Sequence, residues 1–364
     1  MDNRINKRVN GFFLCLVLLH LSVSVILSVL GTGAVNLGTF GALMFTQLLI
    51  MVPSFVFLLV FKCDLSQWVP FKKLRPGTIA LTVLFAFLTM PLISLINVFS
   101  QLFTTNTAIE MSGDFMDMPV VMTVFMVGFF GPFCEEFTFR GIIFGGLRKH
   151  GFVFAAAVVS GLYFGLMHLN LNQFSYALVL GVIFSLLVEA TGSIWGSVIA
   201  HAVINTWNVL LMILMDKAGS EMGVDIFEMT DELGSTDMKL EMIGIMLVIS
   251  VVTSALAVGV YIGISRHEGR YDKVVSMFCR PQPDRISDED VWPEEDEMPV
   301  TDQAWEASEY EEMEQEGTER TEDGNRRSVG KLVTVSGYIA IAVCLFVIFA
   351  LDKVVAWISA NYQR

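Results

Sequence analysis

Long apolar runs recur along the chain and are separated by short polar stretches. An α-helix needs roughly 20 predominantly apolar residues, within a range of about 17 to 25, to cross a bilayer. The pattern predicts membrane-spanning helices over residues 11–30, 37–61, 78–103, 119–147, 152–171, 174–190, 193–215, 241–264 and 332–351. The predicted fold class is all-α: a polytopic transmembrane helical bundle with about eight core spans, and a ninth span after an acidic linker.

Composition supports this class, since 54% of the residues are hydrophobic, 16% are charged and the mean hydropathy is +0.62. Soluble proteins carry about 25% charged residues. The net charge of −14 arises in one segment, because residues 284–323 hold 18 acidic residues against two arginines. A segment this acidic and poor in aliphatic residues buries too little apolar surface to fold. Residues 281–330 are therefore predicted to be a disordered linker, either a solvated spacer or a docking segment for a basic partner.

Basic residues predict the orientation, because cytoplasmic loops carry an excess of lysine and arginine. With nine spans, all the basic clusters fall on one side of the membrane. These clusters contain Arg4, Lys7, Arg8, Lys62, Lys72, Lys73, Arg75, Arg148, Lys149, Arg266, Arg270, Lys273, Arg326, Arg327 and Lys331. We therefore expect a multi-pass protein of the cell (plasma) membrane, with the N-terminus and the acidic linker in the cytoplasm.

Two adjacent glutamates, Glu135 and Glu136, lie inside the fourth span and precede Arg140. Carboxylates within the membrane are costly and rare, and they usually mark a functional site. Residues four apart share one face of a helix, so Glu136 and Arg140 can neutralise each other. Glu135 is turned about 100° away on the helix and remains free to serve as a general base.

Two further pairs of residues lie in later spans. Phe164 stands one turn before His168, and His201 stands one turn before Asn205. An imidazole and a carboxamide on one helix face can donate hydrogen bonds to a developing oxyanion. Glu135 and His168 can hold and deprotonate a water molecule. The alternatives are structural roles: interhelical hydrogen bonding for each single residue, and a purely structural Glu136–Arg140 ion pair.

The ordered motifs Glu135-Glu136-x-x-x-Arg140, Phe164-x-x-x-His168 and His201-x-x-x-Asn205 resemble those of the CAAX protease and bacteriocin-processing (CPBP, Abi) family. This family of intramembrane endopeptidases includes the type II CAAX prenyl endopeptidases. The resemblance covers residues 119–211. It implies that Glu135 is the catalytic base, that His168 helps to activate water and that His201 and Asn205 stabilise the oxyanion. Glu136, Arg140 and Phe164 would support the site.

Metal dependence stays open at this point. Glu135, His168 and His201 could supply three ligands to Zn²⁺ and leave the fourth position for water. The sequence has no HExxH motif, and a metal-free glutamate mechanism uses the same residues. The resemblance therefore implies either a metalloprotease or a glutamic endopeptidase.

The spans and motifs together divide the chain into five predicted segments. These are N-terminal transmembrane helices (1–118), the catalytic transmembrane core (119–215), an outer loop with the eighth span (216–265), the acidic cytoplasmic linker (266–331) and a C-terminal transmembrane helix (332–364) that looks like an added tail. To bring Glu135 toward the middle of the membrane, the fourth helix has to continue to about Leu147. A kink is expected at Gly131-Pro132.

The function expected from these observations is hydrolysis of a peptide bond in a membrane-associated protein or peptide. The expected partners are the lipid bilayer and this substrate, and no nucleic acid is expected. One alternative is a non-catalytic immunity or scaffolding protein of the same fold. A proton-coupled transporter is the other, and the sequence shows no repeated halves to support it.

Overall fold

The computed structural model describes residues 3–30, 37–104, 118–223, 236–278 and 332–362. All its regular elements are helical, and no strand occurs within these ranges. The elements are α1 (Asn3–Leu30), α2 (Gly38–Val60), α3 (Leu65–Trp68), α4 (Pro76–Ser100), α7 (Val120–Thr123), η1 (Val124–Phe130), α8 (Gly131–Glu136), η2 (Phe137–Phe144), α9 (Gly145–Leu147), η3 (Arg148–His150), α10 (Val153–Met167), α11 (Leu171–Thr191), α12 (Ile194–Met222), α14 (Thr236–His267), α15 (Tyr271–Ser276) and α17 (Val335–Tyr362).

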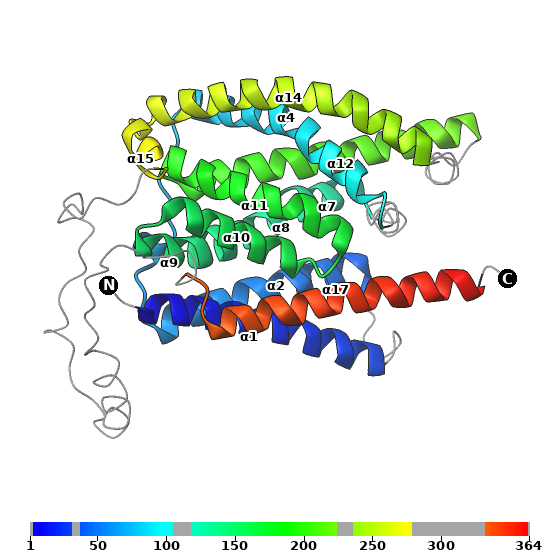
Figure 1. Ribbon diagram of the computed structural model, residues 1–364, viewed down its shortest axis with the longest axis horizontal. Coiled ribbons are helices and arrows are strands. Elements are labelled where there is room, and N and C mark those ends of the chain that lie inside the picture. Colours follow the sequence, from blue (N-terminus) through cyan, green and yellow to red (C-terminus); the bar gives the residue numbers. More distant parts are fainter. Residues whose placement is uncertain (1–2, 31–36, 105–117, 224–235, 279–331, 363–364) are drawn as a thin grey trace, which may run out of the picture.

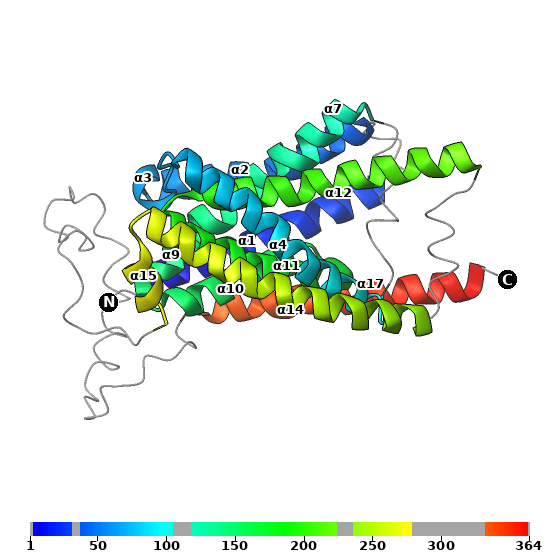
Figure 2. The ribbon, with the colours of Figure 1, turned by 90° about the horizontal axis from the view of Figure 1, so that it is seen from above.

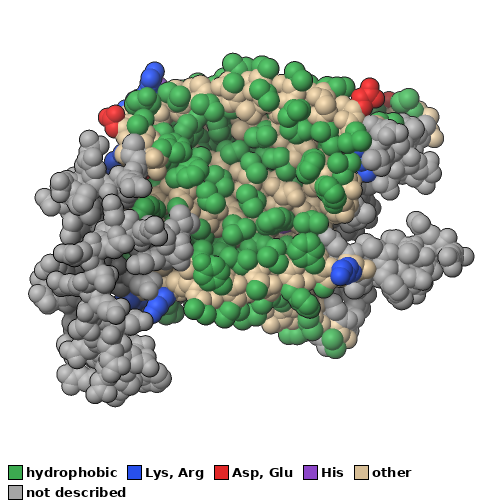
Figure 3. All heavy atoms as spheres, viewed as in Figure 1, with side chains coloured by type: hydrophobic (Ala, Val, Ile, Leu, Met, Phe, Trp, Pro, Cys, Tyr) green, Lys and Arg blue, Asp and Glu red, His purple; other side chains and the backbone are tan. Residues whose placement is uncertain are grey.

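The long helices run side by side and form one elongated bundle (Figure 1). Among the described residues, seven helical stretches are long and apolar enough to cross a membrane, and Val153–Met167 and Val335–Ala350 are shorter apolar helices. Hydrophobic side chains cover the middle of the visible face, while charged ones lie near its two ends (Figure 3). The prediction of a polytopic helical bundle is confirmed, with a helix at each of the nine predicted spans.

The fourth predicted span is one long helical path from Val120 to Leu147, as expected. Its first and last turns, α7 and α9, lie toward opposite ends of the bundle (Figure 2). Two π-helical segments, η1 and η2, flank the short α8 that carries Glu135 and Glu136. The backbone N–H of Gly131 bonds to the carbonyl of Met126, five residues earlier. This wider turn directly precedes Pro132, whose ring would clash with the preceding turn of a regular α-helix.

Two glycines of α10 let it pack closely against α11. A Cβ on Gly161 would lie 2.8 Å from the carbonyl oxygen of Leu178, and one on Gly165 would lie 3.0 Å from that of Phe174. Small residues four apart allow membrane helices to approach in this way. The spacing thus brings α10, which carries Phe164 and ends at His168, against α11.

The turn between α11 and α12 has the residues that helix ends require. Gly192 adopts a positive φ of 67° after the last turn of α11, and the Ser193 hydroxyl accepts a hydrogen bond from the N–H of Trp195 at the start of α12. The same hydroxyl donates to the carbonyl of Lys72 at 2.5 Å. These contacts anchor the beginning of α12 and thereby the height at which His201 lies.

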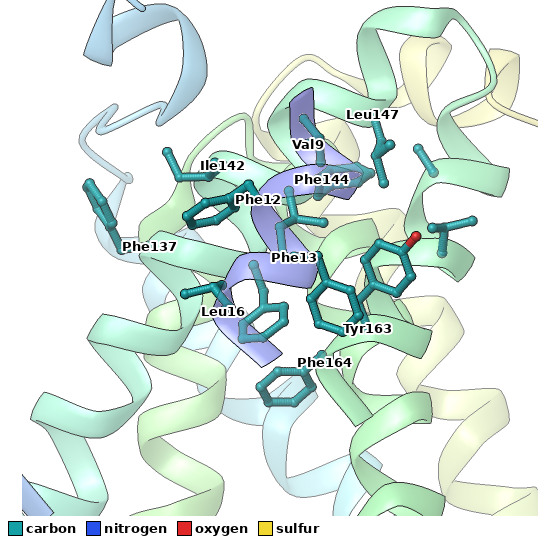
Figure 4. Close-up of a cluster of buried hydrophobic side chains, with 14 of the residues drawn as sticks. Val9, Phe12, Phe13, Leu16, Phe137, Ile142, Phe144, Leu147, Tyr163 and Phe164 are labelled. Carbon is teal, nitrogen blue, oxygen red and sulfur yellow. The ribbon is translucent and has the colours of Figure 1, made fainter. Parts of the chain in front are cut away.

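Aromatic and aliphatic side chains of α1, η2 and α10 form the main core around the site (Figure 4). The labelled members include Phe13 on α1, Phe144 on η2 and Tyr163 and Phe164 on α10. The predicted acidic linker lies mostly outside the described residues, and its disorder stays a prediction. The division of the chain into five segments also stays a prediction.

Candidate active site

Glu136 occupies a fully buried position between a guanidinium and an imidazole. Its Oε1 lies 3.1 Å from Nη1 of Arg140, and neither side chain is exposed. The same oxygen lies 2.9 Å from Nδ1 of His201 on α12. The predicted Glu136–Arg140 pair is thus present, and it extends to the second helix of the site.

Glu135 faces a different environment from its neighbour. Its side chain is 19% exposed, and its Oε2 lies 3.8 Å from Nε2 of His201. His201 therefore has one ring nitrogen toward each of the two glutamates. This distance exceeds hydrogen-bond length, so the two groups are close but not hydrogen-bonded to each other.

Arg140 is held by aromatic rings as well as by charge. Its guanidinium carbon lies 4.3 Å from the ring centre of Phe164 and 5.2 Å from that of Phe184. Arginine over an aromatic face is attracted by the negative potential of the ring. The aromatic walls allow a charged group to remain within the core while Glu136 neutralises it.

Phe164 contacts both histidines of the site. Its ring meets His168 edge to face at 5.1 Å and His201 edge to face at 5.9 Å between ring centres. His168 follows the last residue of α10, and its Nδ1 lies 2.9 Å from the carbonyl oxygen of Phe164. That bond orients the imidazole, so Nε2 is the nitrogen available for chemistry.

Asn205 does not stand free beside His201. Its Nδ2 donates to the backbone carbonyl of Val127 at 3.1 Å. Val127 lies in the π-helical segment η1, and Gly128 beside it permits the approach of α12, since a Cβ there would overlap with Thr206. Asn205 thus joins α12 to the fourth helix, and one of its two amide hydrogens serves this contact.

The sequence analysis missed Phe184 on α11, which is fully buried. Its ring stacks on His201 with 4.9 Å between ring centres and 29° between planes. One phenylalanine in an apolar span carries no signal of such a role. The close packing of α10 on α11 did have a signal, because Gly161-x-x-x-Gly165 is a small-residue spacing typical of membrane helix contacts.

Two other polar residues near the motifs support helix ends. The side chain of Asn170 accepts a hydrogen bond from the N–H of Gln173 and caps α11. Asn172 donates to Asn97 at 2.8 Å and Ser100 at 2.7 Å, which ties α11 to the end of α4. Neither contact reaches the glutamates.

A catalytic zinc ion needs three converging protein ligands. Among the described residues, no group of three His, Cys, Asp or Glu side chains is close enough to hold a metal ion. Glu135 and His201 approach each other, but His168 does not complete a three-ligand set with them. The described side chains as arranged do not fit a three-ligand zinc site.

Comparison with known proteins gives two matches, and the first of them covers this site. Residues 117–207 match the family model "Type II CAAX prenyl endopeptidase Rce1-like". The chain is 29% identical over 176 residues to the "Putative membrane peptidase YdiL" of Bacillus subtilis (strain 168), which covers 44% of this chain and 70% of that protein. These findings fit the CAAX protease and bacteriocin-processing family. They agree with the resemblance of the three motifs, and at family level they support a membrane protease. No solved structure matches the chain significantly.

Proposed function

We propose that this protein is an intramembrane endopeptidase in which Glu135 is the general base for an attacking water molecule. The observation that carries the proposal is the unequal environment of the two glutamates. Glu136 is buried, forms an ion pair with Arg140 and is hydrogen-bonded to His201, whereas Glu135 is partly exposed and faces the other nitrogen of the same imidazole. One carboxylate therefore organises the site and the other is left for chemistry.

The hydrogen on Nδ1 of His201 points to Glu136, because an ionised carboxylate can only accept. Nε2 then faces Glu135 at 3.8 Å. In the proposed reaction, Glu135 takes a proton from water while the water oxygen attacks the carbonyl carbon of a peptide bond. The proton passes through Nε2 of His201 to the leaving nitrogen, and the C–N bond breaks. A new carboxyl group and a new amine result, and the proton balance is closed.

Hydrogen-bond donors stabilise the negative oxygen of the tetrahedral intermediate. The charged imidazole of His201 donates through Nε2 during the reaction, and Asn205 donates through the amide hydrogen not used by Val127. Nε2 of His168 is assigned to holding the attacking water. These roles are proposals, supported by the proximity of Glu135 to His201 and by the orientation of His168.

The proposed substrate is a membrane-associated protein or peptide, because the glutamates lie on a helix that is long enough to cross the bilayer. We also propose that the bundle end bearing the start of α1, α3 and α15 faces the cytoplasm. The basic clusters of the sequence support this orientation. A plasma-membrane location and a basic partner for the acidic linker are further proposals that rest on the sequence alone.

The decisive experiment compares wild-type protein with Glu135→Gln in native membranes and profiles peptide termini by mass spectrometry. We expect termini that occur only with wild type, and a cleavage rate lowered by at least about 100-fold in Glu135→Gln because a general base contributes this much. Glu221→Gln, at an exposed position near the end of α12, is the matched control and should cleave normally. Undiminished cleavage in Glu135→Gln would contradict the proposed mechanism.

Identical profiles in wild type and Glu135→Gln would favour the non-catalytic alternative instead. The same assay, repeated after treatment with a strong chelator, tests the metal question. Cleavage that survives chelation supports the glutamate mechanism. Loss of cleavage, restored by added Zn²⁺, would show that the resting side-chain arrangement rearranges to bind metal.

A further inference from the structure

The C-terminal helix α17 is part of the main core. Ala340, Cys344 and Ile348 recur every four residues and are buried, as is Leu332 just before the helix. In Figure 1, α17 lies beside α1, so the first and last of the described helices are neighbours. The helix expected to be an added tail is therefore packed against the helices that surround the site.

A buried polar cluster joins α17 to α1 and α10. Asn10 on α1 is fully buried, and its Nδ2 donates to the carbonyl of Leu332 at 3.0 Å and to that of Asn6 at 2.6 Å. Its Oδ1 accepts the hydroxyl of Tyr163 and, at 3.4 Å, the N–H of Thr334. One carboxamide thus connects three segments that are far apart in the sequence.

Gly337 allows α17 to lie directly on this cluster. A Cβ at this position would overlap with Oδ1 of Asn10 and with the hydroxyl of Tyr163. Both are buried and cannot move into solvent. Any side chain at residue 337 would therefore push α17 away from α10 or break the bond between Asn10 and Tyr163.

Tyr163 links this cluster to the site. Its ring stacks on that of Phe13, with 4.0 Å between ring centres. Both residues are labelled in Figure 4. The next residue, Phe164, lies against Arg140, His168 and His201. A shift or rotation of α10 at Tyr163 would move the Phe164 ring, which contacts both histidines.

We propose that α17 positions the catalytic side chains, and that Asn10, Tyr163 and Gly337 are the residues through which it does so. The three residues hold α10 in the rotation and height that place Phe164 against both histidines. None of them touches the reacting atoms, so they are positioning residues. This inference rests on the proposed proteolytic function and adds α17 to the elements that determine the geometry of its site.

The test uses the full chain in lipid nanodiscs and a substrate identified from the peptide termini. Tyr163→Phe removes only the hydroxyl and keeps the ring on Phe13, whereas Gly337→Ala introduces the overlapping Cβ. The matched control is Gly259→Ala on α14, where the added Cβ meets nothing within 4 Å. Glu135→Ala is included as the inactive reference. Rates are divided by the amount of folded protein, measured by size-exclusion chromatography.

We expect kcat to fall by about tenfold or more in Gly337→Ala and Tyr163→Phe, because small misplacements around a reacting centre are costly. KM should change by less than about twofold, because no substrate contact is removed. The double variant, with Gly337→Ala and Tyr163→Phe together, should have a kcat only slightly lower than that of Gly337→Ala alone, since both changes act through one contact. Gly259→Ala should match wild type.

Two results would overturn the inference. One is an unchanged kcat per folded molecule in both variants, while Glu135→Ala is inactive. That result would support the proposed function and contradict the positioning role of α17. The other is a loss of activity that tracks only a loss of folded protein, which would make α17 a stabilising element. If wild type and Glu135→Ala gave identical termini, the proposed function and this inference would both fail.

Discussion

Adjacent residues of one helix can serve different roles when one side chain is buried and the other is partly exposed. Glu136 is fully buried between Arg140 and His201, whereas Glu135 is 19% exposed at its side chain. Removing one partner of a buried ion pair leaves an uncompensated charge, which costs more than the loss of an exposed contact. The two glutamates should therefore separate stability from chemistry.

We predict that Glu136→Gln lowers the free energy of unfolding by about 3 to 5 kcal/mol, because Arg140 loses its counter-charge inside the core. Glu135→Gln should lower it by less than about 1 kcal/mol. Reversible unfolding in detergent micelles, followed by circular dichroism, measures both variants. Equal destabilisation by the two substitutions would show that the glutamates share one structural role.

The contact between α10 and α11 shows how helix packing places a side chain of the proposed site. Gly161 and Gly165 bring α10 against the backbone of α11, and His168 follows the last residue of α10. The fourth helix places its glutamates in a different way, since its π-helical segments lie on either side of them. π-helical turns often occur at functional sites. Here one of them presents the carbonyl of Val127 to Asn205.

At the scale of this helix pair, we predict that Gly161→Val forces α10 and α11 apart. The expected cost is about 1 to 3 kcal/mol of stability, as for other overpacked sites. Cleavage per folded molecule should also fall, because Phe164 and His168 move with α10. Gly263→Val on α14 is the matched control, since a Cβ there meets nothing within 4 Å. Normal activity of Gly161→Val would show that this crossing does not determine the site geometry.

Across the whole molecule, ion pairs tie several helices together at the end of the bundle where α10 begins and α11 ends. Glu189 at the end of α11 lies 2.5 Å from Nη1 of Arg148 and 3.2 Å from Nη2 of Arg270. Nε of Arg270 also donates to the carbonyl of Glu189 at 2.5 Å. This carboxylate joins the segment after the fourth helix to the turn before α15. Its arginines belong to the basic clusters that predict the cytoplasmic side.

We predict that segment 279–331 is cut by protease added to inside-out membrane vesicles and resists protease added to right-side-out vesicles. The physical reason is the excess of basic residues, which retains the flanking loops in the cytoplasm. Immunoblotting with tags at the two ends of the chain follows the fragments. Cleavage in right-side-out vesicles would reverse the proposed orientation without affecting the helix assignment.

The sequence by itself determined the class of fold, the nine helical segments and the resemblance to a protease family. Apolar runs must satisfy their backbone groups internally within lipid, which leaves helices as the solution for such segments. The sequence also determined the pairing of Glu136 with Arg140, because residues four apart on one helix are neighbours wherever the helix lies.

Contacts between helices were decided only by the tertiary structure. Three contacts depend on the rotation and depth of separate helices. They are the stacking of Phe184 on His201, the hydrogen bond from Asn205 to Val127, and the close approach of Gly337 to Asn10 and Tyr163. Apolar residues all around a membrane helix carry no signal for that rotation. The arrangement is set by close packing of small residues and by buried polar bonds, which exist only once the helices meet.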